Sequence, residues 1–312
     1  MQMQQEPEHR HTPSPPRTIT PFSVSAVTTA SRLRFPLSQY ELAARVRQAL
    51  EEDSAFNDVT TIATVVSSRH ARAKLVARQS GTIAGIPLAL EAFRQLDPKI
   101  VMRVDAEDGH AVTRGATVLF LTGHARGLLS AERTALNFMQ RMSGIATLTA
   151  RYVAAVRGTR ARILDTRKTT PGWRALEKYA VRAGGGTNHR MDLADSVLIK
   201  DNHLRAVDGD VRLAIRRTRE LEPNAKVEVE CDNVAQVEAA LEGKADIILL
   251  DNMPLDEMRL CVSTVAGRAL VEASGGVHLD NVRAIAETGV DFISVGALTH
   301  SPPAMNLALD FE

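Results

Sequence analysis

The sequence predicts an α/β protein in which an N-terminal α+β, sandwich-like domain precedes an open, incomplete α/β barrel. From residue 160 onward, short apolar runs alternate with helical patterns, which is typical of strand–helix units in a parallel sheet. Upstream of this point, short alternating segments are separated by Gly and Pro residues, as in a small mixed domain. The stretch 160–300 is too short for eight strand–helix units, which usually need roughly 250 residues, so a barrel of about six strands is expected.

Composition limits the classes of protein to be considered. The chain has 312 residues, 44% of them hydrophobic, which is enough for a sizeable core and suggests two domains. A net charge of +1 gives no sign of a nucleic-acid-binding surface, and no nucleic acid partner is expected. Cys231 and Cys261, the only cysteines, form neither a disulfide framework nor a zinc motif, which indicates reduced thiols in a cytoplasmic protein. No apolar run reaches the length of a membrane span, so no membrane association is expected.

The N-terminal part divides into a tail and a domain. Residues 1–36 are rich in Pro, Ser, Thr, His and Gln and are expected to be a disordered extension. The α+β domain is expected over 37–142, beginning with an amphipathic helix at 39–52 that has Leu42, Val46 and Leu50 on one stripe. Strands are expected at 73–78, 83–84, 100–104 and 117–122. Helices are expected at about 129–141 and 143–157, with a break at Gly144.

The barrel domain is expected over 143–300, and residues 301–312 are expected to return as a tail toward the N-terminal domain. Its strands are predicted at 161–164, 196–199, 226–229, 246–250, 270–272 and 292–295. Its helices are predicted at 173–182, 208–221, 234–242, 254–266 and 279–287.

Polar side chains follow nearly every predicted strand of the barrel. Because the carboxyl ends of parallel strands form the active face of such folds, these side chains are expected to converge. The result would be a mixed-charge pocket suited to an anionic substrate and a metal. The strand ends are Asp165-Thr166-Arg167-Lys168, Lys200-Asp201-Asn202-His203, Glu230, Asp251-Asn252, Glu272-Ala273-Ser274-Gly275-Gly276 and Gly296-Ala297.

The last two strand ends predict a phosphate site. Ser274-Gly275-Gly276 precedes a helix expected from about residue 279, and Gly296-Ala297 precedes another short helical stretch. Glycines let backbone N–H groups approach an anion, and a helix N-terminus favours one. One such turn could be an ordinary strand-to-helix connection, but barrels often bind phosphate after their last two strands, and here two such turns follow one another.

The basic residues have two interpretations each. Arg167 and Lys168 could be a solvated surface pair, but an Arg at a strand's carboxyl end suits a carboxylate because of its planar fork. The run 184–190 (GGGTNHR) could be a flexible surface loop. Its place between two basic strand ends favours a binding loop that presents His189 and Arg190.

Glu230 and Asp251 are the acids of the predicted active face. They could pair with neighbouring lysines, or they could hold Mg²⁺ together with substrate phosphate oxygens. Paired carboxylates also occur in glycosidases. The excess of Arg and Lys around them fits transfer of an anionic group better than hydrolysis of a neutral sugar.

These runs resemble the motifs of the quinolinate phosphoribosyltransferase family. The resemblance covers residues 37–312 in order, which makes it more specific than any single motif. One departure is Asn57, which stands where the family usually carries Gly. The matching runs are ERTALNF at 132–138, SGIAT at 143–147, DTRKTTPG at 165–172, KYAV at 178–181, GGGTNHR at 184–190, LIKDNH at 198–203, VEVE at 227–230, ILLDN at 248–252, SGG at 274–276 and VGALTH at 295–300.

The resemblance implies phosphoribosyl transfer from phosphoribosyl pyrophosphate to quinolinate with decarboxylation, in a homodimer that uses Mg²⁺. It also implies roles for individual residues, with Lys168, Glu230 and Asp251 as the catalytic set. Quinolinate would be held by Arg167, His189, Arg190 and Lys200, with Arg133 from the other subunit, and Thr166 would also bind substrate. Lys168 and His300 would lie near the phosphates, and Glu230 and Asp251 at the ribose and Mg²⁺. The 5′-phosphate would be cradled by Ser274, Gly275, Gly276, Gly296 and Ala297.

Two alternatives stay open at this point. One is a related phosphoribosyltransferase-like protein with another substrate, for example one linked to molybdenum transport. The other is a non-catalytic sensor that binds a phosphate ligand on the same barrel. The complete set of Arg167, Lys168, Arg190 and Lys200 favours quinolinate.

Overall fold

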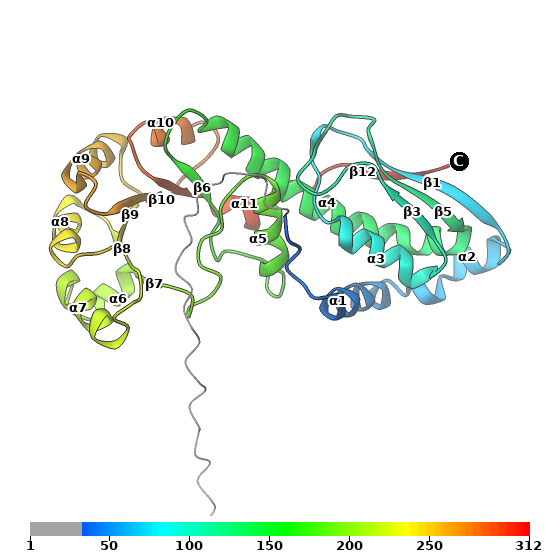
Figure 1. Ribbon diagram of the computed structural model, residues 1–312, viewed down its shortest axis with the longest axis horizontal. Helices are drawn as coiled ribbons and strands as arrows, with labels where there is room; N and C mark the ends of the chain where they lie inside the picture. Colours follow the sequence, from blue (N-terminus) through cyan, green and yellow to red (C-terminus); the bar gives the residue numbers. More distant parts are fainter. Residues whose placement is uncertain (1–32) are drawn as a thin grey trace, which may run out of the picture.

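A computed structural model describes residues 33–312, which form two lobes joined by the long helix α4 (Ala125–Ala155) (Figure 1). The predicted α/β class is confirmed, with a mixed N-terminal lobe and a parallel sheet in the second lobe. No helix of the described part of the chain is long and apolar enough to span a membrane.

The N-terminal lobe begins with α1 (Gln39–Glu52), as predicted from its apolar stripe. Ser38 and Glu41 form a capping box at its start, and Leu42, Val46 and Leu50 are buried. The capping box supplies partners for N–H groups that the first helical turn would otherwise leave unpaired. The short elements η1 (Ala55–Asn57) and α2 (Val59–Thr64) follow.

An antiparallel sheet forms the other layer of this lobe. Within the described residues its order is β12-β1-β5-β3, and a small separate ladder pairs β2 with β4. Helix α4 packs against it, and α3 packs on α4. The bounds are β1 (His70–Ala77), β2 (Gly81–Thr82), α3 (Ile86–Leu96), β3 (Val101–Val104), β4 (Ala111–Val112), β5 (Thr117–His124) and β12 (Leu307–Phe311).

The prediction of two helices separated at Gly144 was wrong, because α4 is continuous over 31 residues. Gly144 serves close packing instead. A Cβ at this position would overlap the carbonyl oxygen of Pro303 and lie 3.2 Å from Ala304 Cα. The segment after the barrel therefore crosses α4 in backbone contact. A glycine allows this crossing, although it favours the helix less than an alanine would.

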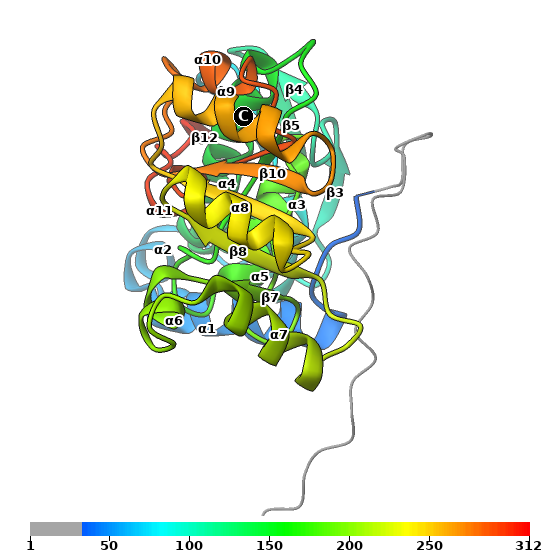
Figure 2. The same ribbon diagram turned by 90° about the vertical axis from the view of Figure 1, so that its left-hand side faces the viewer.

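The barrel lobe contains six parallel strands in the order β6-β11-β10-β9-β8-β7 within residues 33–312. β6 and β7 do not pair with each other, so the barrel is open, as predicted. Helices such as α8 and α9 cover its outer face (Figure 2). The strands are β6 (Arg162–Leu164), β7 (Val197–Ile199), β8 (Val227–Cys231), β9 (Ile247–Asp251), β10 (Leu270–Ser274) and β11 (Phe292–Ser294). The helices are α5 (Arg174–Ala183), α6 (Asp201–Arg205), α7 (Val211–Leu221), α8 (Val234–Glu242), α9 (Leu255–Val265), α10 (Val282–Ala286) and α11 (Ala297–His300).

Both ends of the described chain pack on the body. The expectation of disorder was wrong for residues 33–36, since the Phe35 ring meets Tyr179 edge-on with 5.0 Å between centroids. The Arg34 carbonyl also accepts a hydrogen bond from Arg182. The rest of the expected disordered tail, residues 1–32, lies outside the described residues. At the other end, β12 pairs antiparallel with β1, joining Ala73 to Phe311.

We expect Gly144→Ala to lower the free energy of unfolding, although helix propensity alone would raise it by about 1 kcal/mol. The added methyl group would push the backbone at Pro303 away from α4, and overpacking of this kind costs about 1–3 kcal/mol. Urea denaturation followed by circular dichroism measures the difference. A variant more stable than the natural chain would contradict the role given to this glycine.

Candidate active site

A cavity of about 540 Å³ opens at the carboxyl ends of the barrel strands. Eleven residues expected in the site line it: Thr166, Arg167, Lys168, His189, Arg190, Lys200, Glu230, Asp251, Ser274, Gly275 and Gly276. The lining is completed by Leu198, Leu249, Asn252, Glu272 and Ser294. Parallel pairing explains this convergence, because it carries every strand's carboxyl end to the same edge of the sheet.

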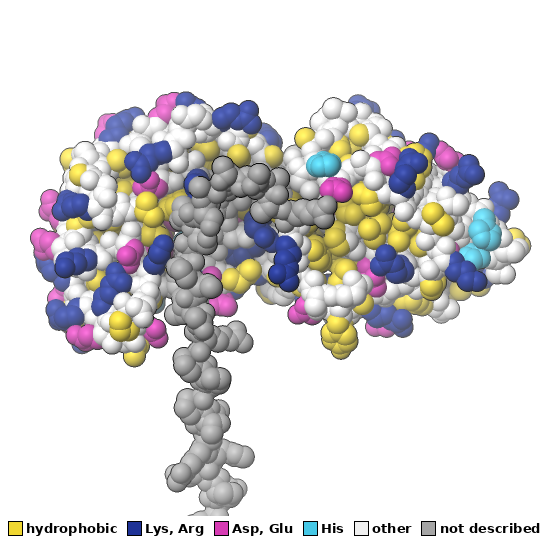
Figure 3. Space-filling model, in the orientation of Figure 1, with side chains coloured by type: hydrophobic (Ala, Val, Ile, Leu, Met, Phe, Trp, Pro, Cys, Tyr) yellow, Lys and Arg dark blue, Asp and Glu magenta, His cyan; other side chains and the backbone are white. Residues whose placement is uncertain are grey.

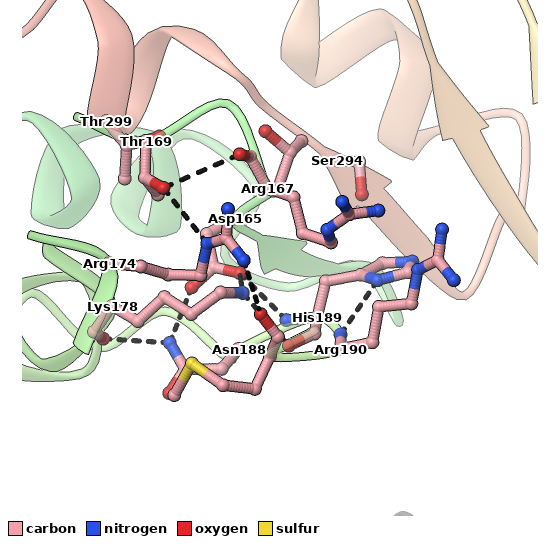
Figure 4. Close-up of polar contacts among 12 residues, drawn as sticks. Asp165, Arg167, Thr169, Arg174, Lys178, Asn188, His189, Arg190, Ser294 and Thr299 are labelled. Atoms are coloured by element: carbon pink, nitrogen blue, oxygen red, sulfur yellow. Dashed lines mark hydrogen bonds and ion pairs between the residues drawn. The ribbon is translucent and has the colours of Figure 1, made fainter. Parts of the chain in front are cut away.

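Two guanidinium groups dominate one side of the cavity. Arg167 follows β6, and Arg190 lies in the loop before β7, where its Nη1 donates to Ser196 O over 3.1 Å. Figure 4 shows both guanidinium groups extending to the same side, away from Lys178. Burial and the charge of Arg167 lower the pKa of Arg190. Arg167 Nε is buried and has no hydrogen-bond partner among the described residues, so this side of the cavity suits an anion.

His189 is held from both ring nitrogens. Its Nδ1 accepts the Arg190 backbone N–H over 2.8 Å, which leaves Nε2 to carry the proton of the neutral ring. Nε2 lies 3.2 Å from Glu228 Oε2 and 3.7 Å from Glu272 Oε2. Burial opposes the charged ring, but the hydrogen bond to Glu228 and the nearby Glu272 raise the pKa of His189 overall.

Glu228 and Glu272 form an acidic floor beneath the cations. Glu272 was expected at a strand end of the pocket but without a role, and Glu228 was not predicted there. Burial, followed by the charge of Glu228, raises the pKa of Glu272 to about 8, so its carboxyl is mostly protonated at neutral pH. Ser294 Oγ donates to Glu272 Oε1 over 2.5 Å. The alternation in Val227-Glu228-Val229-Glu230 was the signal for Glu228, because residues two apart share one face of a strand.

These three side chains, His189, Glu228 and Glu272, lie close enough together to ligate a metal ion. The proton on Glu272 and the nearby guanidinium groups of Arg167 and Arg190 both oppose a dication there. The cluster is better described as a set of hydrogen-bonding groups that partly neutralises the cations above it.

A second pair of acids, Glu230 and Asp251, lies on the adjacent strands β8 and β9. Lys200 Nζ donates to Glu230 Oε2 over 2.6 Å, and Asn252 Nδ2 donates to Asp251 Oδ2 over 2.7 Å. Burial, followed by the charge of Glu230, raises the pKa of Asp251. Two carboxylates that repel each other and face a cavity are hard oxygen donors of the type Mg²⁺ accepts.

The glycine turns leave backbone open to the cavity. Gly275 and Gly276 have φ values of +89° and +57°, a region that favours glycine, and a Cβ on Gly275 would overlap the Asn252 amide. At the next strand end, a Cβ on Gly296 would lie 3.1 Å from Lys168 Cδ and 3.3 Å from His300 Nε2. Lys168 and His300 therefore meet at the Gly296 turn.

Four expected site residues do not line the cavity in the described chain: Arg133, Gly296, Ala297 and His300. The last three lie at its rim, around the start of α11. Arg133 is exposed on α4 and lines a separate hollow with Asp58 and Val59. A single chain therefore does not bring Arg133 to the cavity.

The fold and the site together define a barrel enzyme for anionic, phosphate-bearing substrates. Comparison with known proteins is more specific. The family model described as "Quinolinate phosphoribosyl transferase, C-terminal domain" matches residues 145–310, and the one for the N-terminal domain matches residues 58–143. This chain belongs to the quinolinate phosphoribosyltransferase family, whose members are pentosyltransferases of NAD biosynthesis.

Individual relatives align with this chain over nearly their whole length. The chain is 47% identical over 273 residues to a nicotinate-nucleotide pyrophosphorylase [carboxylating] of Mycobacterium leprae, covering 85% of this chain and 95% of that protein. The solved structure of the nicotinate-nucleotide pyrophosphorylase from Francisella tularensis matches with a TM-score of 0.83 and 38% identity, covering 89% of this chain and 99% of that one. The enzyme of the same name from Ehrlichia chaffeensis matches with a TM-score of 0.83 and 40% identity, covering 88% and 99%.

The raised pKa of Glu272 predicts a pH-dependent stability. Between the ordinary value of 4.5 and about 8, the folded chain binds more protons at this site than the unfolded chain, so stability falls as pH rises through that window. Glu272→Gln keeps the neutral form at every pH. The Tm of this variant minus that of the natural chain should therefore grow from about pH 5 to about pH 8.5 in scanning calorimetry. A difference that stays constant over this range would show that Glu272 is ionised throughout.

Proposed function

We propose that the barrel cavity carries out phosphoribosyl transfer from phosphoribosyl pyrophosphate to quinolinate with decarboxylation, giving nicotinate mononucleotide, pyrophosphate and CO₂. The observation that carries this proposal is the pair of guanidinium groups beside the glycine turns in one cavity. The cations suit a dicarboxylate, and the turns suit a phosphate. Family membership supplies the identity of the two substrates.

Quinolinate would bind on the side of the cationic groups. Arg167 and Arg190 each offer a planar fork that fits a carboxylate, and Lys200 adds a third charge. His189 would contribute through its ring, and Thr166 through its place at the cavity wall. The buried Arg167 Nε supports this role, since it has no hydrogen-bond partner within residues 33–312 and a carboxylate would supply one.

Phosphoribosyl pyrophosphate would bind across the other strand ends. Ser274, Gly275 and Gly276 would hold its 5′-phosphate together with Gly296 and Ala297 through backbone N–H groups. Lys168 and His300, which meet at the Gly296 turn, would lie near the phosphates. This division would place the two reactants side by side, which supplies much of the rate enhancement in a bimolecular reaction.

Glu230 and Asp251 would hold Mg²⁺ and the ribose hydroxyls. Two carboxylates suit Mg²⁺ only if substrate oxygens and water complete its coordination, because this ion prefers six oxygen ligands. When bound, the ion would neutralise charge on the pyrophosphate. The same carboxylates would stabilise the positive charge that develops on the ribose as the pyridine nitrogen attacks C1.

Decarboxylation would need no further catalytic group. Once C1 is attached, the pyridine nitrogen is cationic, the electron pair left at C2 by loss of CO₂ is stabilised beside it, and this carbanion then takes a proton from water. The catalytic set of Lys168, Glu230 and Asp251 would therefore act in the transfer step. Arg167 and Arg190 would keep both carboxylates in register until one of them leaves.

The chain would act as a homodimer with shared sites. Exposed apolar side chains support this: Phe56, Val59, Ile62 and Val66 lie on and beside η1 and α2. Arg133 lines the hollow next to Val59, so a second copy that covered the apolar residues would also receive Arg133. On the face drawn in Figure 3, hydrophobic side chains gather on the N-terminal lobe, while charges of both signs are interspersed over the barrel lobe.

Substrate choice tests the proposed cavity. Quinolinate should turn over and nicotinate should not, because a single carboxylate leaves part of the cationic side unpaired. Arg167→Ala should raise the KM for quinolinate by about a hundredfold, the cost of losing a bidentate charge pair. Quinolinate consumption can be followed spectrophotometrically. Comparable turnover of nicotinate would contradict the dicarboxylate site, and binding of both substrates without turnover would favour a sensor.

Subunit complementation tests the shared site. Arg133→Ala and Lys200→Ala should each be inactive as pure proteins. After subunit exchange about half of the dimers are mixed, each with one intact site, so roughly a quarter of the natural activity should return. The mixed dimer is verified by differential tagging, and a mixture of Lys200→Ala with Lys168→Ala serves as the control without rescue. Verified mixed dimers that stay inactive would remove Arg133 from the neighbouring site.

A further inference from the structure

An ion pair buried behind the cavity, Asp165 with Lys178, takes no part in the function described above. Asp165 directly follows β6, and Lys178 lies in the middle of α5. Their side chains are 0% and 1% exposed, and neither residue lines the cavity. They therefore cannot contact a substrate in the described structure.

The pair is bound to the backbone of the loop that carries His189 and Arg190 (Figure 4). Asp165 Oδ1 accepts the His189 backbone N–H over 2.9 Å, and Lys178 Nζ donates to the His189 carbonyl over 3.0 Å. Asn188 Nδ2 donates to Asp165 Oδ2 over 2.5 Å and to the Lys178 carbonyl over 2.8 Å. Both backbone polar groups of His189 thus depend on one ion pair.

The orientation of the cavity side chains follows from these bonds. With its backbone held on the Asp165 side, His189 has its ring directed to Glu228, and its Nδ1 accepts the Arg190 N–H. The bond from the Arg190 backbone N–H to the His189 ring fixes the backbone of Arg190 relative to that ring. From this position the Arg190 guanidinium reaches the cavity. A shift of the backbone at His189 would therefore move two groups that face the substrate.

Stability alone does not explain why charges are buried here. Burial raises the pKa of Asp165 and lowers the pKa of Lys178, so each charge is costly to maintain at this position. An apolar pair of similar volume is often as stable as a buried ion pair. An apolar pair, however, could neither accept the His189 N–H nor donate to its carbonyl.

We propose that Asp165 and Lys178 are positioning residues that hold His189 and Arg190 in the geometry for binding the pyridine dicarboxylate. This proposal rests on the assignment of His189 and Arg190 to quinolinate. It predicts an effect confined to one substrate, because within residues 33–312 no side-chain hydrogen bond or ion pair joins Asp165 or Lys178 to the glycine turns on the phosphate side.

The test replaces both charges together, so that no unpaired charge is left in the interior. In Asp165→Leu/Lys178→Met we expect a lowered Tm, because the His189 N–H, the His189 carbonyl and the Asn188 amide lose their partners even though no charge is left unpaired. The KM for quinolinate should rise by about tenfold or more through misplacement of His189 and Arg190. The KM for phosphoribosyl pyrophosphate should stay within about twofold. Steady-state kinetics with each substrate varied in turn gives both constants.

A matched control removes an ion pair at the other end of the barrel. Asp291 precedes β11, binds Arg160, and accepts the Val271 backbone N–H over 2.9 Å with a side chain that is 14% exposed. Asp291→Asn should lower the Tm and leave both KM values unchanged. Equal changes of the two KM values in the double variant, or no change in either, would overturn the proposal.

Two further variants keep the outcome decisive. If the double variant does not fold, Asp165→Asn/Lys178→Met replaces it, since this pair leaves no buried charge unpaired and still removes the bond to the His189 carbonyl; the same ratio of KM values then decides. Arg190→Ala separates this proposal from the proposed function. If Arg190→Ala raises the KM for quinolinate and the pair variants do not, the positioning role fails alone. If Arg190→Ala has no such effect, the assignment of Arg190 fails first.

Discussion

The cavity depends on holding several positive charges close together away from bulk water. Arg167 and Arg190 repel each other, as the lowered pKa of Arg190 indicates, and Arg190 also loses hydration through burial. The barrel offsets this cost with acids on neighbouring strands, Glu228 and Glu272 below His189 and Glu230 beside Lys200. The parallel sheet makes the arrangement possible, because β6 and β7 at its two ends and β8, β9 and β10 between them deliver their cations and acids to the same edge.

This balance of charges also bears on the protonation of Glu272. Burial and the charge of Glu228 raise the pKa of this carboxyl to about 8. A floor of fully ionised acids would attract the arginines away from a substrate carboxylate. A floor without acids would leave the arginines uncompensated whenever the cavity holds no anion. Partial ionisation lies between these limits, so the guanidinium groups remain available to an incoming carboxylate.

Much of the fold and of the cavity lining could be predicted from the sequence, because the patterns that indicate them lie within short segments. The apolar stripe of Leu42, Val46 and Leu50 gave α1 within its observed bounds, and polar residues after each apolar run gave most of the cavity lining. The open barrel followed from a count of strand–helix units. Arg167, Lys200 and Asp251 could be placed in one cavity because a parallel sheet has a single carboxyl edge.

The parts that could not be predicted depend on contacts between distant segments. Gly144 lies within a continuous helix. A glycine is needed there because the backbone of Pro303, far along the chain, leaves no room for a side chain. Phe35 lies in a polar segment whose composition suggests disorder, yet its ring meets Tyr179. In the sequence, Glu228 is one polar residue of an ordinary alternating strand. Its role becomes visible only in the fold, where β10 places Glu272 beside the same histidine, His189. Local patterns carry no information about which remote segment arrives at a given place.

The pairing of β12 with β1 has a consequence for how the molecule is made. The N-terminal sheet includes a strand that follows the whole barrel in the chain, with Ala73 beside Phe311. During synthesis the first domain therefore emerges with an open sheet edge, and that edge stays uncovered until the whole barrel has been translated. An exposed strand edge is a site for pairing with other chains, so the nascent protein passes through a period of vulnerability to aggregation that ends only when β12 has left the ribosome.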